Sequence, residues 1–377
     1  GPPGAVAAEA ERSKRLEGDT MRIGMIGLGG MGAYMVRRLI EDGYECVAYD
    51  KSVKAVRAAA AVGAIGASST ADLIERLPAP RTIWIMVPAA AVDEVIDHLR
   101  PQLAAGDILV DGGNSHYSDD IRRADALRAD GVHYLDVGTS RGVLGVVQGY
   151  CLMVGGDLDT FETLEPIFGT LSPGGRVAER RAAPRPARAA GSAPRAGQRH
   201  GAANEDALAM ASMGYLYCGP SGAGHFVKMV LNGIEYGVMA AYAEGLSVLQ
   251  GADAGLCEPR KSADAKSEPL EHPRLFQYRL DIAAITEVWR HGSIISSKLL
   301  DLMARALVAD PSLSGYSSQV SDSGEERWAV QAAIEMGVPA HVLSAALYAR
   351  FAARGKAEFA DKAFGAMRLG FGGQGER

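Results

Sequence analysis

The feature that most constrains this chain is a short apolar run that enters a glycine-rich turn. The run RIGMIGL leads into GLGGMG, which gives Gly27, Gly29 and Gly32 the GxGxxG spacing at the start of a helical stretch. One glycine permits a tight turn, the next lets the backbone approach a pyrophosphate, and the third allows close packing of helix on strand. Because the positive end of that helix faces the turn, the pattern predicts a dinucleotide-binding loop. The predicted loop comprises Gly27, Leu28, Gly29, Gly30, Met31 and Gly32.

The second apolar run, CVAYD, ends at Asp50, and this position predicts the identity of the dinucleotide. It follows the glycines by about 20 residues, where an acidic side chain accepts hydrogen bonds from the ribose hydroxyls of NAD. The 2′-phosphate of NADP would meet a like charge there. NAD is therefore favoured, and Lys51 and Arg57 nearby leave NADP as the alternative. Val87, at the end of a third apolar run, is included among the predicted cofactor contacts.

Short apolar runs alternate with helical stretches as far as residue 156, which predicts a mostly parallel sheet covered on both faces. Helical spacing alone dominates from about residue 222. The predicted fold class is an α/β Rossmann-type nucleotide-binding domain followed by an all-α domain. The expected divisions are a disordered extension at 1–20, the Rossmann domain at 21–174, a basic low-complexity linker at 175–204 and a helical domain at 205–377.

Composition excludes several classes of partner. Hydrophobic residues make up 47% and charged residues 22%, which is typical of a globular protein. The 39 basic and 45 acidic residues give a net charge of -6. Although the predicted linker holds seven arginines between Arg176 and Arg199, it has no aromatic residues for base stacking, so we expect no nucleic-acid partner. No apolar stretch approaches the roughly 20 residues of a membrane span, and we expect a cytoplasmic protein.

The four cysteines lie far apart and show no metal-ligand spacing, so we expect free thiols and no metal.

Lys228, Asn232 and Glu235 are spaced i, i+4 and i+7, so a helix that begins near Ala223 would place all three on one face. The neighbouring residues are mostly apolar, among them Val227, Met229 and Ile234, and they are expected to bury this face. A lysine in such surroundings loses solvation, which lowers its pKa towards that of a general base or acid. The alternative is that Lys228 forms a surface ion pair with a nearby carboxylate. Polar residues on either side of Lys228 would favour this alternative, but the flanking residues are apolar.

Two turns carry small polar groups at the ends of predicted strands, where open α/β sheets bind ligands. DGGNS contains Asn114, and DVGTSRG contains Ser140 and Gly142. Each alone reads as an ordinary turn. Together with the glycine loop and the lysine helix, they predict a substrate cleft.

The ordered set of motifs resembles the decarboxylating 6-phosphogluconate dehydrogenases, in particular the short bacterial branch within the β-hydroxyacid dehydrogenase superfamily. The resemblance covers roughly residues 21–371 apart from the basic run. It implies that the helical domain binds substrate and forms a homodimer or homotetramer. The motifs are GLGGMG, DGGNSHYSDD, LDVGTSRGVLGVVQGYCLMVGG, GPSGAGHFVKMVLNGIEYGVM, WRHGSIISS and SDSGEERWAVQAAIEMGVP.

The resemblance also implies a reaction, the oxidative decarboxylation of 6-phosphogluconate to ribulose 5-phosphate and carbon dioxide in the pentose phosphate pathway. Lys228 would take the proton from the carbon 3 hydroxyl and later return a proton to the new carbonyl, and Glu235 would protonate carbon 1 of the product. The implied substrate-binding residues are Asn114, Ser140, Gly142, Asn232, Tyr236 and Arg368. Asn114 is shared with the cofactor site.

Three positions depart from the family pattern. Leu231 stands in the place of a histidine, Arg141 stands in the place of a glycine, and Gln374 replaces a histidine near the end of the tail. These departures keep two alternatives open. One is a β-hydroxyacid dehydrogenase that acts on another small acid, and the other is a catalytically silent paralogue that still binds nucleotide.

Overall fold

The computed structural model describes residues 21–140, 145–174, 207–256, 270–320 and 324–370. The chain divides into two compact units, Gly1–Met229 and Val230–Arg377. The extension expected at 1–20 and the linker expected at 175–204 lie outside the described residues. We describe each unit by itself.

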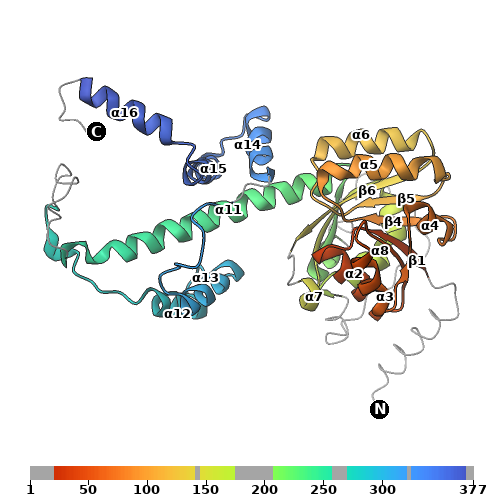
Figure 1. Ribbon diagram of the computed structural model, residues 1–377, viewed down its shortest axis with the longest axis horizontal. Helices are drawn as coiled ribbons and strands as arrows, with labels where there is room; N and C mark the ends of the chain where they lie inside the picture. Colours follow the sequence, from red (N-terminus) through yellow and green to blue (C-terminus); the bar gives the residue numbers. More distant parts are fainter. Residues whose placement is uncertain (1–20, 141–144, 175–206, 257–269, 321–323, 371–377) are drawn as a thin grey trace, which may run out of the picture. The chain divides into compact units, whose positions relative to one another are not determined.

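The first unit is built on an eight-stranded sheet in the order β3-β2-β1-β4-β5-β6-β7-β8. Figure 1 labels β1, β4, β5 and β6 of this sheet. Neighbouring strands are parallel except β6 and β7. The first six strands have the Rossmann order, so the predicted fold class is confirmed. The strands are β1 (Arg22–Ile26), β2 (Glu45–Tyr49), β3 (Ile65–Gly66), β4 (Thr82–Ile85), β5 (Ile108–Asp111), β6 (His133–Ser140), β7 (Cys151–Gly156) and β8 (Tyr215–Gly219).

Helices cover both faces of this sheet, because each strand buries side chains in both directions. One hydrophobic cluster joins the strands to α2, α3 and α8, and the other joins them to α4, α5 and α6. The helices are α2 (Gly30–Glu41), α3 (Val53–Ala61), α4 (Thr70–Glu75), α5 (Ala89–Leu99), η1 (Arg100–Gln102), α6 (Tyr117–Arg128), α7 (Gly145–Gln148) and α8 (Leu158–Leu171).

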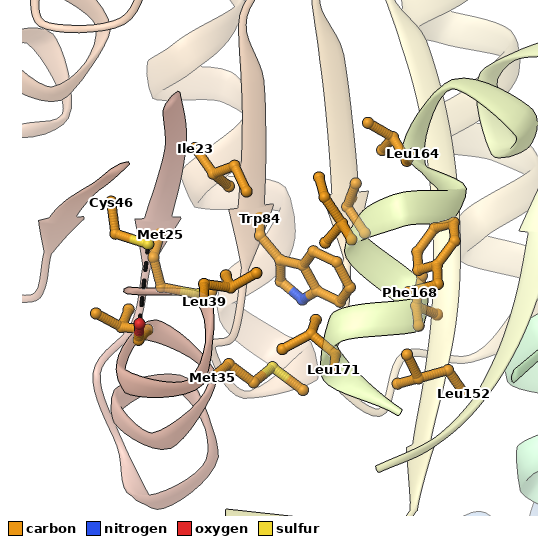
Figure 2. Close-up of a cluster of buried hydrophobic side chains, with 14 of the residues drawn as sticks. Ile23, Met25, Met35, Leu39, Cys46, Trp84, Leu152, Leu164, Phe168 and Leu171 are labelled. Atoms are coloured by element: carbon orange, nitrogen blue, oxygen red, sulfur yellow. Dashed lines mark hydrogen bonds between the residues drawn. The ribbon is translucent and has the colours of Figure 1, made fainter. Parts of the chain in front are cut away.

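Strand β4 shows how the alternation of side chains produces these two layers. Its sequence TIWI is buried throughout, and Trp84 points to one cluster while Ile83 and Ile85 point to the other. Figure 2 shows the indole of Trp84 between the strands and α8, where it meets Phe168 edge-on with ring centroids 6.1 Å apart. Arg38 of α2 is also buried on the side of the sheet that α8 covers. It donates hydrogen bonds to the carbonyl oxygens of Thr170 and Ser172 at the end of α8.

The sheet continues past residue 204, into the segment that we expected to be entirely helical. Strand β8 pairs with β7, and Gly214 and Gly219, both with positive φ, bound it. Tyr215 at its start is buried in the core of the first unit. The alternating tyrosines of β8 favour an extended strand. We did not predict this strand because the helical spacing from about residue 222 dominates the segment that follows it.

The second unit consists of helices, to which the long helix α11 belongs from Val230 onwards. Arg290 and Asp301 join α12 and α13 by an ion pair of 2.9 Å. A Cβ at Gly233 of α11 would contact α14 and α15, so a side chain there would separate these helices. No described helix is both long and apolar enough to cross a bilayer. The elements are α11 (Ala223–Gln250), η3 (Gly251–Leu256), η4 (Pro273–Leu275), α12 (Ile282–Gly292), α13 (Lys298–Ala309), α14 (Glu325–Glu335), α15 (His341–Ala353) and α16 (Glu358–Gly370).

The first turn of α11 lies directly against β6 and β7, because glycines line the contact. A Cβ at Gly138 of β6 would overlap the Cβ of Lys228 and lie 2.8 Å from the carbonyl oxygen of Gly224. A Cβ at Gly224 of the helix would overlap backbone atoms of both strands. The helix therefore approaches the sheet as closely as two backbones allow.

We expect Gly138→Ala to push α11 away from β6 and to lower the free energy of unfolding by about 1–3 kcal/mol, as overpacking does in a dense core. Urea unfolding followed by circular dichroism measures this difference.

Gly169→Ala in α8 is the matched control, since nothing lies within 4 Å of a Cβ added there. It should be neutral or stabilising by up to about 1 kcal/mol. Equal unfolding free energies for the two variants would show that the contact at Gly138 is not tight.

Candidate active site

The glycine loop between β1 and α2 has the geometry of an anion site. Gly27 has a φ of +95°, and a Cβ there would overlap the backbone of Met86. A Cβ at Gly32 would overlap the carbonyl of Gly27, so the third glycine does allow helix and strand to touch. In contrast, nothing lies within 4 Å of a Cβ at Gly29 or Gly30. The loop thus exposes its backbone at the start of α2, which fits a pyrophosphate.

Asp50 lies at the end of β2 next to this loop. Its two carboxylate oxygens accept hydrogen bonds from the amides of Leu28 at 2.6 Å and Ser52 at 2.7 Å. Each oxygen keeps a further lone pair for a ribose hydroxyl. Lys51 forms an ion pair of 3.3 Å with Glu94, so its charge is partly offset. This arrangement fits NAD better than the 2′-phosphate of NADP.

The carboxyl ends of β1, β4 and β5 meet around Val87. Its Cγ1 would lie 3.1 Å from a Cβ at Gly27, and its carbonyl oxygen 3.0 Å from a Cβ at Gly113. Asn114 follows Gly113 and is exposed, although both of its neighbours are buried. The structure therefore brings the glycine loop, Val87 and the Asn114 turn together at one edge of the sheet.

Lys228 lies where the end of β6 reaches the same region. Helix α11 begins at Ala223, as the spacing predicted. The half-buried Lys228 lies over Gly138, and Ser140 is two residues further along the same face of β6. The stem of the lysine is thus held against the strand that carries Ser140.

The apolar neighbours of Lys228 are less buried than we expected. Met229 is 4% exposed, but Val227 is 39% exposed and Ile234 is 52% exposed. Up to Met229, only one side of α11 lies against the strands, so Val227 on the other side is exposed. A lowered pKa of Lys228 remains a prediction.

The other predicted substrate residues belong to the second unit or lie outside the described residues. Asn232 is buried, and Glu235 and Tyr236 are half-buried on the next turns of α11. The Arg350 guanidinium lies 3.5 Å from the centre of the Tyr236 ring. Arg368 lies on α16. The described residues do not include Arg141, Gly142 or Gln374.

Sequence analysis missed a buried carboxylate that holds the start of α11. Asp136 of β6 is fully buried, and it accepts hydrogen bonds from the amides of Gly222 at 2.7 Å and His225 at 2.9 Å. A carboxylate at this end of a helix is favourable because the helix dipole is positive there. The motif LDVGTS contains this aspartate, but nothing in its spacing relates it to a helix some 86 residues later.

Asp120 and Asp111 extend this buried group. The ring of His225 contacts Asp120 at 2.7 Å, and Tyr134 donates its hydroxyl hydrogen to Asp120 at 2.8 Å. Arg123 donates to Asp111 at 3.2 Å. All of these side chains are at most 3% exposed.

Asp111, Asp120 and His225 offer possible metal ligands within 4.8 Å of one another. The guanidinium of Arg123 lies within 4 Å of both carboxylates, so a divalent cation there would meet a positive charge. The donors present therefore do not fit a metal ion. The expectation that the protein binds no metal stays a prediction.

Comparisons with known proteins identify the family. Residues 22–178 match the family described as the NAD binding domain of 6-phosphogluconate dehydrogenase. The chain is 34% identical to the putative 6-phosphogluconate dehydrogenase YqeC of Bacillus subtilis, covering 94% of this chain and 98% of the relative. It is 36% identical to an NAD(+)-dependent, decarboxylating 6-phosphogluconate dehydrogenase of Haloferax volcanii, covering 93% and 97%.

A solved structure of Plasmodium falciparum 6-phosphogluconate dehydrogenase has the same fold, with a TM-score of 0.68 at 23% identity, covering 94% of this chain and 65% of that one. The two relatives match almost end to end and exceed 30% identity. The chain therefore belongs to the 6-phosphogluconate dehydrogenase family.

Proposed function

We propose that this protein oxidises and decarboxylates 6-phosphogluconate to ribulose 5-phosphate and carbon dioxide with NAD. The observation that carries the proposal is the position of Lys228, whose stem lies against Gly138 on the strand that ends at Ser140. One turn before it, the His225 ring contacts the carbonyl of Gly113, next to Asn114. A basic group thus lies at the edge of the sheet where the exposed glycine loop would hold NAD.

In this reaction the bound NAD would supply the hydride acceptor at carbon 3. Lys228, as the free amine, would take the proton of the carbon 3 hydroxyl, which leaves a β-keto acid. The resulting ammonium would donate to the carbonyl oxygen as carbon dioxide leaves, so that no negative charge accumulates on the enediol. Glu235 would then protonate carbon 1 of the product. Gly142, Ser140, Asn114 and Asn232 would orient the sugar acid, and Tyr236 and Arg368 would approach its phosphate.

The family supports further expectations about assembly and setting. We infer a homodimer or homotetramer in the cytoplasm that acts in the pentose phosphate pathway. Helices α15 and α16 expose Tyr348 by 62%, Phe359 by 85% and Phe364 by 62%, and exposed aromatic side chains of this kind are typical of association surfaces.

The test of the activity is direct. Purified protein is mixed with 6-phosphogluconate and NAD, then NADP, while the absorbance of the reduced cofactor and the release of carbon dioxide are followed. Reduction only with other hydroxy acids would favour a different β-hydroxyacid dehydrogenase. Nucleotide binding without reduction of either cofactor would favour a silent paralogue.

Lys228→Ala should lower kcat by about 10²–10⁴-fold, because it removes the general base and acid. The affinity for NAD should change less than threefold, since the substitution leaves the residues of the glycine loop unchanged. Steady-state kinetics and a fluorescence titration with NAD measure the two quantities.

Lys362→Ala is the control, because that lysine lies on α16, where it forms an exposed ion pair with Glu358. It should leave kcat unchanged. A Lys228→Ala protein that keeps most of its rate would remove this lysine from the mechanism.

Asp50→Asn should raise the affinity for NADP relative to NAD by about tenfold, which corresponds to about 1.4 kcal/mol. The asparagine loses the charge that faces the 2′-phosphate but keeps an oxygen that can accept from the amide of Leu28. Dissociation constants for both cofactors measure the ratio. Equal losses for NAD and NADP would show that Asp50 only holds the loop.

A further inference from the structure

The start of α11 covers three buried carboxylates, and each of them faces at least one positive group. Asp111, Asp120 and Asp136 are 0% exposed. Asp111 faces the guanidinium of Arg123 at 3.2 Å, and Asp136 faces the amides at the positive end of α11. Asp120 lies 3.8 Å from the guanidinium of Arg123 and only 2.7 Å from the ring of His225, which is its nearer positive partner. Because an isolated buried charge is costly, a charge on His225 would complete the pairing.

The contacts of the His225 ring also require two hydrogens. Its Nδ1 lies 2.7 Å from a carboxylate oxygen of Asp120, and its Nε2 lies 3.2 Å from the carbonyl oxygen of Gly113. A carbonyl oxygen and an ionised carboxylate accept hydrogen bonds but do not donate them. With Asp120 ionised, both ring nitrogens must donate, which makes the ring an imidazolium.

The surrounding charges stabilise this state. Desolvation lowers the pKa of His225, but the carboxylates of Asp120, Asp111 and Asp136 outweigh it and raise that pKa to about 9. Desolvation raises the pKa of Asp120 to about 6, against the attraction of His225. Around pH 7–8 both members of the pair are therefore ionised.

The position of His225 relates this charge to the candidate active site. The carbonyl that it holds belongs to Gly113, which directly precedes the exposed Asn114. On the helix, Lys228 follows His225 by three residues, which is about 4.5 Å along the axis. One buried ring therefore joins the turn that carries Asn114 to the helix that carries Lys228.

We propose that His225 is a positioning residue, a buried imidazolium that fixes the distance between the Asn114 turn and Lys228. The proposal rests on the proposed function of those two residues. A reacting group that moves by about 1 Å can lose about 10²-fold in rate, so this link acts on turnover rather than on nucleotide binding. Nothing in the glycine loop contacts the histidine in the described hydrogen bonds.

The first experiment is nuclear magnetic resonance of the protein labelled with ¹⁵N-histidine, with the His225 signals assigned by their loss in His225→Gln. Both ring nitrogens should carry hydrogen at pH 7.5, and the ring should titrate near pH 9. A neutral ring at pH 7.5 would overturn the proposal. This result does not depend on turnover, so it is separate from any failure of the proposed function.

The second experiment compares the kinetics of variants. His225→Gln should lower kcat by about 10–100-fold while the dissociation constant of NAD changes less than twofold. The control is His133→Gln, which removes a histidine at the other end of β6 whose ring forms a hydrogen bond with Thr160 among the described contacts. An unchanged kcat in His225→Gln, or an equal loss of NAD binding, would overturn the positioning role.

Asp120→Asn is a second variant that keeps an acceptor for the ring and removes the charge. The pKa of His225 should fall by at least one unit. Because turnover depends on the charged ring, the decrease of kcat at alkaline pH should then begin at a lower pH. The His225–Asp120 pair is also faced by Asp111, Asp136, Arg123 and Tyr134. Burial raises the pKa of Tyr134 well above its usual value, so Tyr134 keeps its hydroxyl hydrogen in the pH range of this experiment. An alkaline limb that does not move would contradict the proposal.

The free energy of unfolding should also depend on the protonation of His225. The pKa of His225 is raised in the folded state from about 6.5 to about 9, so its contribution is full below pH 6.5 and is lost as the pH rises through 9. The difference in urea midpoint between the wild type and His225→Gln should therefore shrink between pH 7 and pH 10. A difference that stays constant would indicate a neutral ring.

Discussion

The carboxylate of Asp136 is the interaction on which the candidate active site depends. It accepts the two amide hydrogens at the start of α11, and glycines on both sides of the contact let the helix lie directly on β6 and β7. This contact fixes where the helix begins and therefore where Lys228 falls over the end of β6. Without it, the amides at the end of the helix would be buried with no acceptor.

Burying several charges in one place is a poor way to gain stability, because desolvation offsets much of the attraction. Hydrophobic residues of similar volume would serve a purely structural role as well. A charged network does fix direction and register, since its hydrogen bonds form only at particular distances and angles. The pairs Arg123 with Asp111 and His225 with Asp120 connect α6, β5 and α11. Asn114 lies in the turn between β5 and α6, and Lys228 lies on α11.

Much of the fold and part of the candidate site could be predicted from local spacing. The glycine loop, Asp50 and a helix that starts at Ala223 all depend on residues within one or two elements, so periodicity detects them. The network could not be found in this way, because Asp120 and His225 are 105 residues apart and meet only through the sheet topology. The role of Gly138 could not be found in this way either, because nothing in the spacing of β6 shows that a helix packs against this glycine.

The hydrogen bonds of Asp50 indicate why cofactor choice and loop structure are coupled in this chain. Both oxygens of this carboxylate are held by backbone amides, so the side chain cannot rotate away from a ligand. The ribose hydroxyls of NAD can use the remaining lone pairs, but a 2′-phosphate would face a fixed negative charge. The same bonds connect β2 to the glycine loop at Leu28. The proposed preference for NAD over NADP therefore depends on the contact that orders the loop, and a change at this position acts on both.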